Sequence, residues 1–260
     1  NYYFSLLIIF DRRREMLTSP YIVKNFLLAA ISEAEYPTLF ENLELIDLPF
    51  QKTIYHASQT IDYVYFPIQS VVSLISTSND QSTSEVALIG REGLVGLPAF
   101  LGHDQANSQA LVLTPGPIVR VDKNIFVVES RRPGHFRDHL LAYTQARLNQ
   151  LSQNIACKSH HTIQQQFARW LLSVHDQVEG DQLLLTQPFI AQLFGIRRAS
   201  ITEAAIKLQD AGYISYRRGK ITILDPEGLK SVSCRCYGTV KTFFDQNNAS
   251  CCGYSGHQSQ

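Results

Sequence analysis

The segment from Leu185 to Leu224 constrains the fold of this chain more than any other stretch. Two short helix patterns flank a tight turn at Phe194-Gly195-Ile196. In the second pattern, apolar residues recur at i, i+3, i+4 and i+7, which gathers them on one helix face. These residues are Ile201, Ala204, Ala205 and Leu208. Two consecutive helices joined in this way predict a helix-turn-helix.

A β-hairpin pattern follows the second helix. Gly212 ends the helix pattern, and two β-type runs, 213–217 and 220–224, flank Arg218-Gly219. The order helix, turn, helix, hairpin is that of a winged helix-turn-helix, whose second helix enters the major groove of DNA. The segment therefore predicts a DNA-binding domain.

The charges of this segment support that interpretation. Arg197 and Arg198 fall in the first turn of the second helix, where cations oppose the helix macrodipole. A DNA phosphate or a guanine edge would compensate them. Between Gly195 and Lys220 there are six Lys/Arg against two acids, although the whole chain has a formal net charge of zero. The alternative is a solvated basic turn without a partner.

Length and cysteine usage bound the compartment and the number of domains. A chain of 260 residues suits two domains. Its five cysteines are too few and too clustered for a secreted disulfide framework, so we expect a reducing cytoplasm.

The N-terminal segment offers no membrane span. Its apolar run, residues 4–10, is too short to cross a membrane, and no membrane partner is expected. Met16 is the only methionine, which suggests that it is the biological start and that residues 1–15 are an extension.

The residues before the helix-turn-helix predict first a helical region and then a β region. Residues 21–45 are predicted to be helical, with a break at Pro37. Short β runs then predict a barrel, roll or sandwich that ends at Pro133-Gly134. The runs are 53–57, 61–66, 71–77, 84–89 and 118–122.

A long helix is predicted from about His135 to Cys157. Its apolar positions alternate steps of three and four, which is typical of a dimerisation seam. The seam consists of Leu141, Thr144, Leu148, Leu151 and Ile155. The alternative is a helix packed on its own barrel. The polar residues 158–161 are a candidate hinge, and a further helix is expected over 162–178.

The sequence offers little enzyme chemistry. It contains no phosphate-binding Gly-Lys-Ser/Thr loop and no nucleophile elbow. His135 and His139 are four apart and could share a metal. Cys234 and Cys236, together with Cys251-Cys252 and His257, could bind zinc or act as a redox switch, although buried packing is the simpler role for Cys234 and Cys236.

The order of these elements, and the residues of the helix-turn-helix, resemble the Crp/Fnr superfamily of bacterial transcription regulators. The resemblance covers about 25–237. It rests on Gly195, Arg198, Ser200, Ile201, Leu208, Gly212, Ile214 and 221–225. The run 90–96, Gly-Arg-Glu-Gly-Leu-Val-Gly, and a Ser-Cys-x-Cys-Tyr motif at Ser233 look like one subgroup of that family.

The resemblance implies which residues contact DNA. The base-contacting arginine of the family falls on Arg198, whereas Ala199 and Glu203 replace the family's usual glutamate and a later arginine. Glu203 could accept a hydrogen bond from cytosine. Arg197, Ser200, Arg217, Arg218 and Lys220 suit phosphates, and Thr202 lies on the exposed helix face with Ala199 and Glu203.

The resemblance does not extend to cyclic nucleotide binding. Family members that bind it hold the ribose with a glutamate and the phosphate with an arginine. Here Leu97 stands at the glutamate position, and the arginine position falls near Asn107. The N-terminal cysteine cluster of the iron–sulfur members is also missing, because the first cysteine is Cys157. No cofactor is therefore expected, and the residues name no effector.

The resemblance thus implies an α+β fold. We expect a double-stranded β-helix or jelly-roll domain like those that bind cyclic nucleotides (16–133), a dimerisation helix (134–160), a winged helix-turn-helix (161–230) and a C-terminal tail (231–260) that is disordered from Gln246. The expected function is a homodimeric, cytoplasmic regulator that binds operator DNA, with RNA polymerase as a further candidate partner. The alternatives are a thiol or metal sensor acting through Cys234 and Cys236, and a ligand- or partner-binding β module with weak DNA binding.

Overall fold

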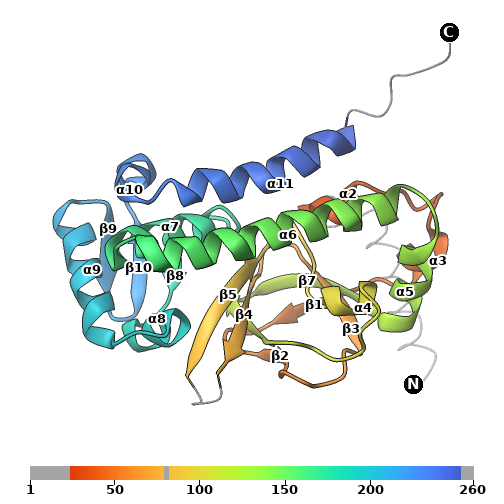
Figure 1. The fold of residues 1–260 in the computed structure, drawn as a ribbon, viewed down its shortest axis with the longest axis horizontal. Coiled ribbons are helices and arrows are strands. Elements are labelled where there is room, and N and C mark those ends of the chain that lie inside the picture. Colours follow the sequence, from red (N-terminus) through yellow and green to blue (C-terminus); the bar gives the residue numbers. More distant parts are fainter. Residues whose placement is uncertain (1–23, 79–81, 253–260) are drawn as a thin grey trace, which may run out of the picture.

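The computed structural model describes residues 24–78 and 82–252, so Met16 and the suggested extension 1–15 lie outside the described residues. A β-rich domain is followed by the long helix α6 (His135–His160), and a helical domain with a small sheet lies at the end of α6 (Figure 1). The last helix, α11 (Cys236–Cys252), returns along α6. This arrangement confirms the predicted fold class.

The β-rich domain consists of two antiparallel sheets. The first has the order β1-β7-β3 and the second the order β2-β6-β4-β5. Strands β1 (Glu44–Leu48), β7 (Gly116–Asp122) and β3 (Tyr63–Pro67) form the first sheet, and β2 (Thr53–Tyr55), β6 (Gln109–Thr114), β4 (Val71–Thr77) and β5 (Thr83–Ile89) form the second. Alternate residues face the core, as in β3, where Val64 and Phe66 are buried and Tyr63 and Tyr65 are only half-buried.

The predicted helix over 21–45 is wrong within the described residues. Two short helices, α2 (Phe26–Ala29) and α3 (Pro37–Glu41), replace it, and Leu45 lies in strand β1. Pro37 begins α3 instead of breaking a helix, because the first helical position needs no N–H donor. Asn25 is the N-cap of α2, and its side-chain oxygen accepts from the backbone N–H groups of Leu27 and Leu28.

The β region ends earlier than predicted. Strand β7 ends at Asp122, and its carboxylate caps α5 (Lys123–Arg131) by accepting from the N–H of Asn124 at 2.7 Å. Another short helix, α4 (Leu97–Phe100), follows the turn after β5. Pro133-Gly134 therefore separates α5 from α6 and does not close the sheet.

Helix α6 is longer than predicted and includes three of the four residues of the candidate hinge 158–161. It continues through His160, and only His161 leaves the helical conformation. Lys, Ser and His lower helix propensity only slightly, so a polar run without Gly or Pro does not end a helix. Helix α7 (Ile163–His175) then begins at Thr162, which forms a capping box with Gln165.

The domain beyond α6 has the predicted winged helix-turn-helix. Helices α8 (Gln187–Phe194) and α9 (Arg198–Asp210) pack on α7 around a core that includes Trp170 and Leu171. Strands β8 (Gln182–Leu184), β10 (Lys220–Ile223) and β9 (Ile214–Arg217) form an antiparallel sheet in that order, and α10 (Pro226–Val232) follows. The hairpin of β9 and β10 is the wing.

The expected disorder from Gln246 is wrong, because α11 continues to Cys252. Val240 and Phe244 of α11 are buried against α6, and the rings of Phe244 and Tyr143 lie 6.3 Å apart. These apolar residues lie six and two positions before Gln246, where the polar end of the segment begins. Their burial gives the helix a reason to form that the composition after Gln246 does not show.

Candidate DNA-binding site

Gly195 sets the turn between the two helices of the motif. It adopts a left-handed conformation with φ of 68°, and its N–H bonds to the carbonyls of Ala191 and Gln192 at the end of α8. A side chain would be strained there, and its Cβ would lie 2.9 Å from the carbonyl oxygen of Thr83. The glycine therefore permits both the turn and the close contact with strand β5.

Helix α9 has one buried and one exposed face, as the spacing predicted. Ile201 and Leu208 are fully buried against the domain core. On the opposite face, Arg198, Ala199, Glu203 and Ile206 are exposed, and Ser200 and Thr202 are half-buried. The predicted base-reading residues thus share one accessible helix face.

Two arginines stand at the start of this helix. Arg197 is the N-cap residue, and Arg198 is the first helical residue, so the pair begins one position earlier than expected. Within the described residues, the first turn of α9 contains no acidic side chain, and Arg197 makes no side-chain cap. The positive end of the helix dipole and two exposed guanidinium groups thus coincide, which favours an anion at this point.

Two polar side chains on the exposed side of α9, those of Thr202 and Glu203, have partners within the protein. The Thr202 hydroxyl lies 2.8 Å from Gln187 Oε1, to which it can donate. The Glu203 carboxylate forms an exposed ion pair with Lys207 at 2.7 Å, and the hydrogen bond from Lys207 lowers the pKa of Glu203. Exposed pairs of this kind contribute little energy, so Glu203 remains available to a base.

The wing presents three cations beside α9. Arg217 and Lys220 are paired across the hairpin, with Arg218 and Gly219 at its tip. Both tip residues have positive φ, 50° and 76°, as a two-residue hairpin turn of type I′ requires. Arg217, Arg218 and Lys220 are all exposed. Tyr216 of β9 fixes the wing by donating its hydroxyl to the carbonyl of Leu185 at 2.7 Å.

The predicted dimer seam lies on an open face of α6. Leu141, Leu148 and Ile155 are 48%, 54% and 69% exposed, whereas Thr144 and Leu151 are half-buried. Large apolar side chains at these exposures, spaced along one helix, form a surface suited to a second helix. Within the described residues of one chain, the side chains of Leu148 and Ile155 remain more than half exposed.

A cavity of about 350 Å³ lies between the β-roll and α6. Its lining includes Leu97 and Asn107, the two positions where nucleotide-binding relatives would have a glutamate and an arginine, and also Leu148 and Leu151 of the seam. Arg147 is the cation among the described lining residues. The contacts of Arg147 decide whether the cavity offers a free charge.

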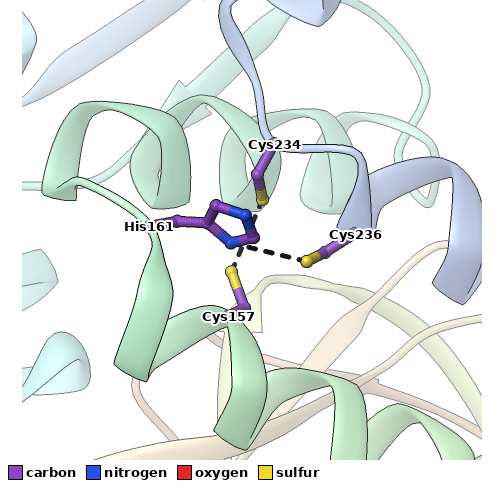
Figure 2. A group of neighbouring side chains, drawn as sticks. All are labelled: Cys157, His161, Cys234 and Cys236. Carbon is purple, nitrogen blue, oxygen red and sulfur yellow. Dashed lines mark hydrogen bonds between the residues drawn. The ribbon is translucent and has the colours of Figure 1, made fainter.

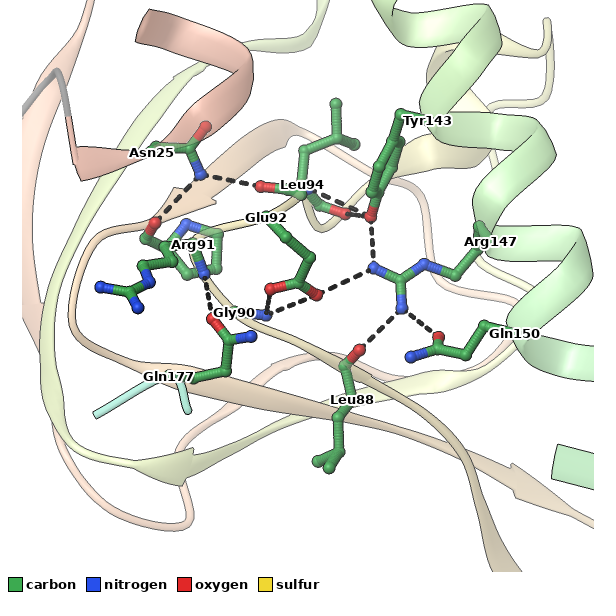
Figure 3. A network of polar contacts seen from close by, with 12 residues as sticks. Asn25, Leu88, Gly90, Arg91, Glu92, Leu94, Tyr143, Arg147, Gln150 and Gln177 are labelled. Atoms are coloured by element: carbon green, nitrogen blue, oxygen red, sulfur yellow. Dashed lines mark hydrogen bonds and ion pairs between the residues drawn. The ribbon is translucent and has the colours of Figure 1, made fainter. Parts of the chain in front are cut away.

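Arg147 is committed to a buried network (Figure 3). Its guanidinium donates to the carbonyl of Leu88 at 2.7 Å, to the Tyr143 hydroxyl at 2.6 Å and to Gln150. It also pairs with the Glu92 carboxylate at 3.5 Å, and the Arg147 and Glu92 side chains are only 5% and 9% exposed. The sequence analysis missed this network, because residues 55 apart give no local signal.

The Gly90-Arg91-Glu92-Gly93 turn joins the β-roll to α6 and α7. The Glu92 carboxylate accepts from the N–H of Gly90 at 3.0 and 3.1 Å. The Arg91 side chain donates to the carbonyl of Asp176. The backbone N–H of Arg91 donates to the side chain of Gln177 (Figure 3). The side chain of Asp176 accepts from the Tyr237 hydroxyl at 2.7 Å. The turn and the Cys-x-Cys-Tyr motif therefore meet at the end of α7.

Glu85 forms a second link between the β-roll and the helical domain. Its carboxylate accepts from the Ser73 hydroxyl at 2.6 Å and from the indole N–H of Trp170 on α7 at 2.7 Å. Burial raises the pKa of Glu85 to about 7, although both hydrogen bonds oppose this shift. The proton of Glu85 is therefore bound more tightly in the folded protein than in the unfolded chain.

This shift predicts a pH dependence of stability. Because the folded pKa is raised, the favourable contribution is complete below about pH 4.5 and is lost as the pH rises to about 7. A neutral Glu85→Gln variant should lack this loss, which amounts to roughly 2 to 3 kcal/mol. Thermal unfolding followed by circular dichroism from pH 4.5 to 8 measures the difference.

Glu227→Gln, which removes an exposed carboxylate, is the matched control and should follow the unaltered protein. Parallel stability profiles for the unaltered protein and Glu85→Gln would show that Glu85 does not titrate in this range.

The cysteines are grouped differently from the predicted arrangement. Cys234 and Cys236 lie next to Cys157 and His161 of the α6 end, and their potential ligand atoms are within 4.8 Å of one another. The predicted grouping with Cys251 and Cys252 is wrong, because α11 places these two cysteines at the opposite end of the helix from Cys236. His257 lies outside the described residues. No helix of the described residues is both long and apolar enough to cross a membrane.

The fold and its exposed basic helix define a class: a DNA-binding protein with a β-roll, a long helix and a winged helix-turn-helix. Comparisons with known proteins agree. Residues 46–128 match the cyclic nucleotide-binding domain, and residues 165–232 match the Crp-like helix-turn-helix domain. The chain belongs to the Crp/Fnr family and is a DNA-binding transcription regulator of that type. The family consists of transcription regulators and not of enzymes.

Individual relatives are distant in sequence. A "CRP-like cAMP-activated global transcriptional regulator" of Mycobacterium tuberculosis is 23% identical over 198 residues, which cover 74% of this chain and 88% of the relative. The structure of FixK2 from Bradyrhizobium japonicum is similar with a TM-score of 0.62 at 15% identity, covering 74% of this chain and 98% of FixK2. A putative Crp/Fnr regulator from Eubacterium rectale has a TM-score of 0.63 at 16% identity, covering 79% and 96%.

Proposed function

We propose that this chain acts in the bacterial cytoplasm as a homodimeric regulator that reads a roughly palindromic operator with one α9 helix per half-site. The observation that carries the proposal is the exposed face of α9, with Arg197 and Arg198 at its start and three wing cations beside it. Arg198 contacts a base, with Ala199, Thr202 and Glu203 along the same groove. Arg197, Ser200, Arg217, Arg218 and Lys220 contact phosphates.

The dimer part of the proposal rests on α6. Two copies packed through Leu141, Leu148 and Ile155 would cover the exposed apolar face of the helix. The β-roll (16–133) then rests on a dimerisation helix (134–160) that sets the spacing of two DNA-binding domains (161–230). Half-sites of a helix-turn-helix dimer are one helical turn of DNA apart or a multiple of it. RNA polymerase is the proposed partner at the promoter.

Selection of bound genomic fragments by the purified full chain, followed by sequencing, tests the function. We expect an enriched inverted repeat whose half-sites are about 10 base pairs apart or a multiple of that. Enrichment of a single unrepeated site would contradict the dimer, and the absence of any enriched sequence would contradict operator binding.

Cyclic AMP is not the proposed signal, although the mycobacterial relative is described as cAMP-activated. The cavity presents Leu97 and Asn107 where the ribose and phosphate partners would stand, and Arg147 is bound to four groups of the protein. A phosphate in a cavity with a mainly apolar lining needs a cationic partner. The cavity is therefore proposed to hold no cyclic nucleotide in the usual manner.

Calorimetric titration checks this prediction. Cyclic AMP should give no saturable heat, and adenosine, which lacks the phosphate, should behave in the same way. Saturable 1:1 binding of cyclic AMP in the micromolar range, stronger than that of adenosine, would show that the protein supplies a phosphate partner.

One alternative function is a sensor acting through Cys234 and Cys236, and the position of Cys157 and His161 beside the two thiols supports it. A β module with weak DNA binding is distinguished by the selection experiment, which would then yield no enriched sequence.

A further inference from the structure

Four potential metal ligands meet where α6 ends (Figure 2). Cys157 lies in the last turn of α6, and His161, four positions later, is the C-cap residue of that helix. Cys234 lies in the connection between α10 and α11, and Cys236 is the first residue of α11. The sulfur and nitrogen atoms of the four side chains all lie within 4.8 Å of one another, although two separate segments supply them.

Two of the separations between the ligand atoms are close to those around one tetrahedral ion. Zinc lies about 2.3 Å from cysteine sulfur and about 2.0 to 2.1 Å from histidine nitrogen. Tetrahedral angles then place two sulfurs about 3.8 Å apart, and a sulfur and a nitrogen about 3.6 Å apart. The Sγ atoms of Cys157 and Cys234 are 3.5 Å apart, and Cys236 Sγ is 3.6 Å from His161 Nδ1. Small side-chain adjustments would complete the coordination.

The surroundings suit thiolate ligands. Cys157, Cys234 and Cys236 are 0%, 3% and 3% exposed, whereas His161 is half-buried and gives a route from solvent. Gln153 Nε2 donates to Cys236 Sγ at 3.0 Å, as hydrogen-bond donors do to metal-bound sulfur. Three thiolates and a divalent ion carry one net negative charge.

We propose that Cys157, His161, Cys234 and Cys236 form a mononuclear site for Zn²⁺ or a divalent ion of similar preference. Three cysteines and one histidine are a common ligand set of structural zinc sites, in which the protein occupies all four positions. On binding, the three thiols lose their protons to solvent, and the neutral imidazole donates through Nδ1. The site does not depend on the function proposed for the DNA-binding domain.

Two other uses of the cluster fit less well. A Cys157–Cys234 disulfide would require the sulfurs to approach to about 2.05 Å and would leave Cys236 and His161 without a role. An iron–sulfur core places two or more irons between the cysteine sulfurs, which must then lie farther apart than the ligands of a single ion. The compact set of four therefore favours one metal ion.

The ion would clamp α11 onto the end of α6. Cys157 and Cys234 are 77 positions apart in the chain, and the DNA-binding domain lies between them. His161 immediately precedes Thr162, the N-cap of α7, so the site also fixes the point at which the chain enters that domain. Closing so long a loop is expected to raise the stability of the folded state.

Metal analysis of the full chain, purified under reducing conditions with added zinc and then desalted, tests the site. We expect one zinc per chain and a higher melting temperature than that of the chelator-treated protein. Cobalt substitution should give the intense visible absorption of a tetrahedral ion and a thiolate charge-transfer band. Zinc well below one per chain, with no shift in melting temperature when zinc is added back, would overturn the proposal.

Ligand variants place the ion. Cys157→Ser and His161→Ala should each lower the zinc affinity at least tenfold, and loss of the Gln153 amide in Gln153→Ala should lower it by about 10- to 100-fold. Cys251→Ser/Cys252→Ser and His160→Ala remove cysteines and a histidine outside the cluster and should keep one zinc per chain. Because the unaltered protein is titrated with zinc directly, a ligand variant that fails to fold does not prevent the test. Loss of zinc in the control variants alone would place the ion elsewhere and overturn the assignment.

Discussion

Replacing Arg147 by methionine is expected to lower the free energy of unfolding by about 3 to 5 kcal/mol. The variant keeps most of the side-chain volume but leaves the buried Glu92 carboxylate without its cation. It also removes the donors to the Leu88 carbonyl and the Tyr143 hydroxyl, and the cation over the rings of Tyr143 and Phe244. Urea denaturation followed by circular dichroism measures the loss.

Two further variants separate the charge pair from packing. Arg137→Met, at an exposed position of the same helix, should change stability by about 0.5 kcal/mol or less. Arg147→Met/Glu92→Gln removes both charges and should recover part of the loss, because a buried unpaired charge costs more than the absence of the pair. If the stability loss of the double variant equals the sum of the losses of Arg147→Met and Glu92→Gln measured separately, the coupling between Arg147 and Glu92 is negligible.

Arg198→Ala is expected to weaken operator binding by about 1 to 3 kcal/mol, roughly 5- to 150-fold, and to relax the preference at one base pair of each half-site. The arginine is exposed at the first position of α9, and the proposed function assigns it a bidentate contact to guanine. Competition binding with operator duplexes altered at one position at a time measures both effects.

Lys220→Ala provides the contrasting result. Loss of a phosphate contact should weaken binding to all sequences alike and reduce the slope of log affinity against log salt by about one. Lys230→Ala removes an exposed cation of the same domain on α10, away from the wing, and should change neither quantity. An Arg198→Ala variant with unaltered operator affinity would show that another residue reads the base.

The helix-turn-helix could be predicted from the sequence because its signals are local. The spacing of Ile201 and Leu208, the turn at Gly195 and the hairpin tip at Arg218-Gly219 each act within a few residues. The seam on α6 is local in the same sense, since one helix face carries it. The partner that the seam would contact is a second chain, and the dimer therefore stays a prediction.

Features that depend on distant contacts could not be predicted. Helix α11 was expected to be disordered in part because its stabilising contacts are with α6, about a hundred positions earlier, as in the Phe244–Tyr143 pair. The meeting of Cys157 and His161 with Cys234 and Cys236 follows from the same return of the chain. Pairing the cysteines by their closeness in sequence suggested Cys251 and Cys252, because that reasoning assumed a tail and not a helix.

The hydrogen bond between Trp170 and Glu85 makes Trp170 an intrinsic fluorescence probe of the contact between the two domains. Trp170 is the only tryptophan of the chain, and its indole N–H points from α7 to a carboxylate of β5 at 2.7 Å. Indole emission shifts in wavelength and intensity when a nearby carboxylate changes its charge or when water reaches the ring. Movement of the helical domain relative to the β-roll can therefore be followed in the unlabelled protein, in real time, while DNA or a candidate effector is added.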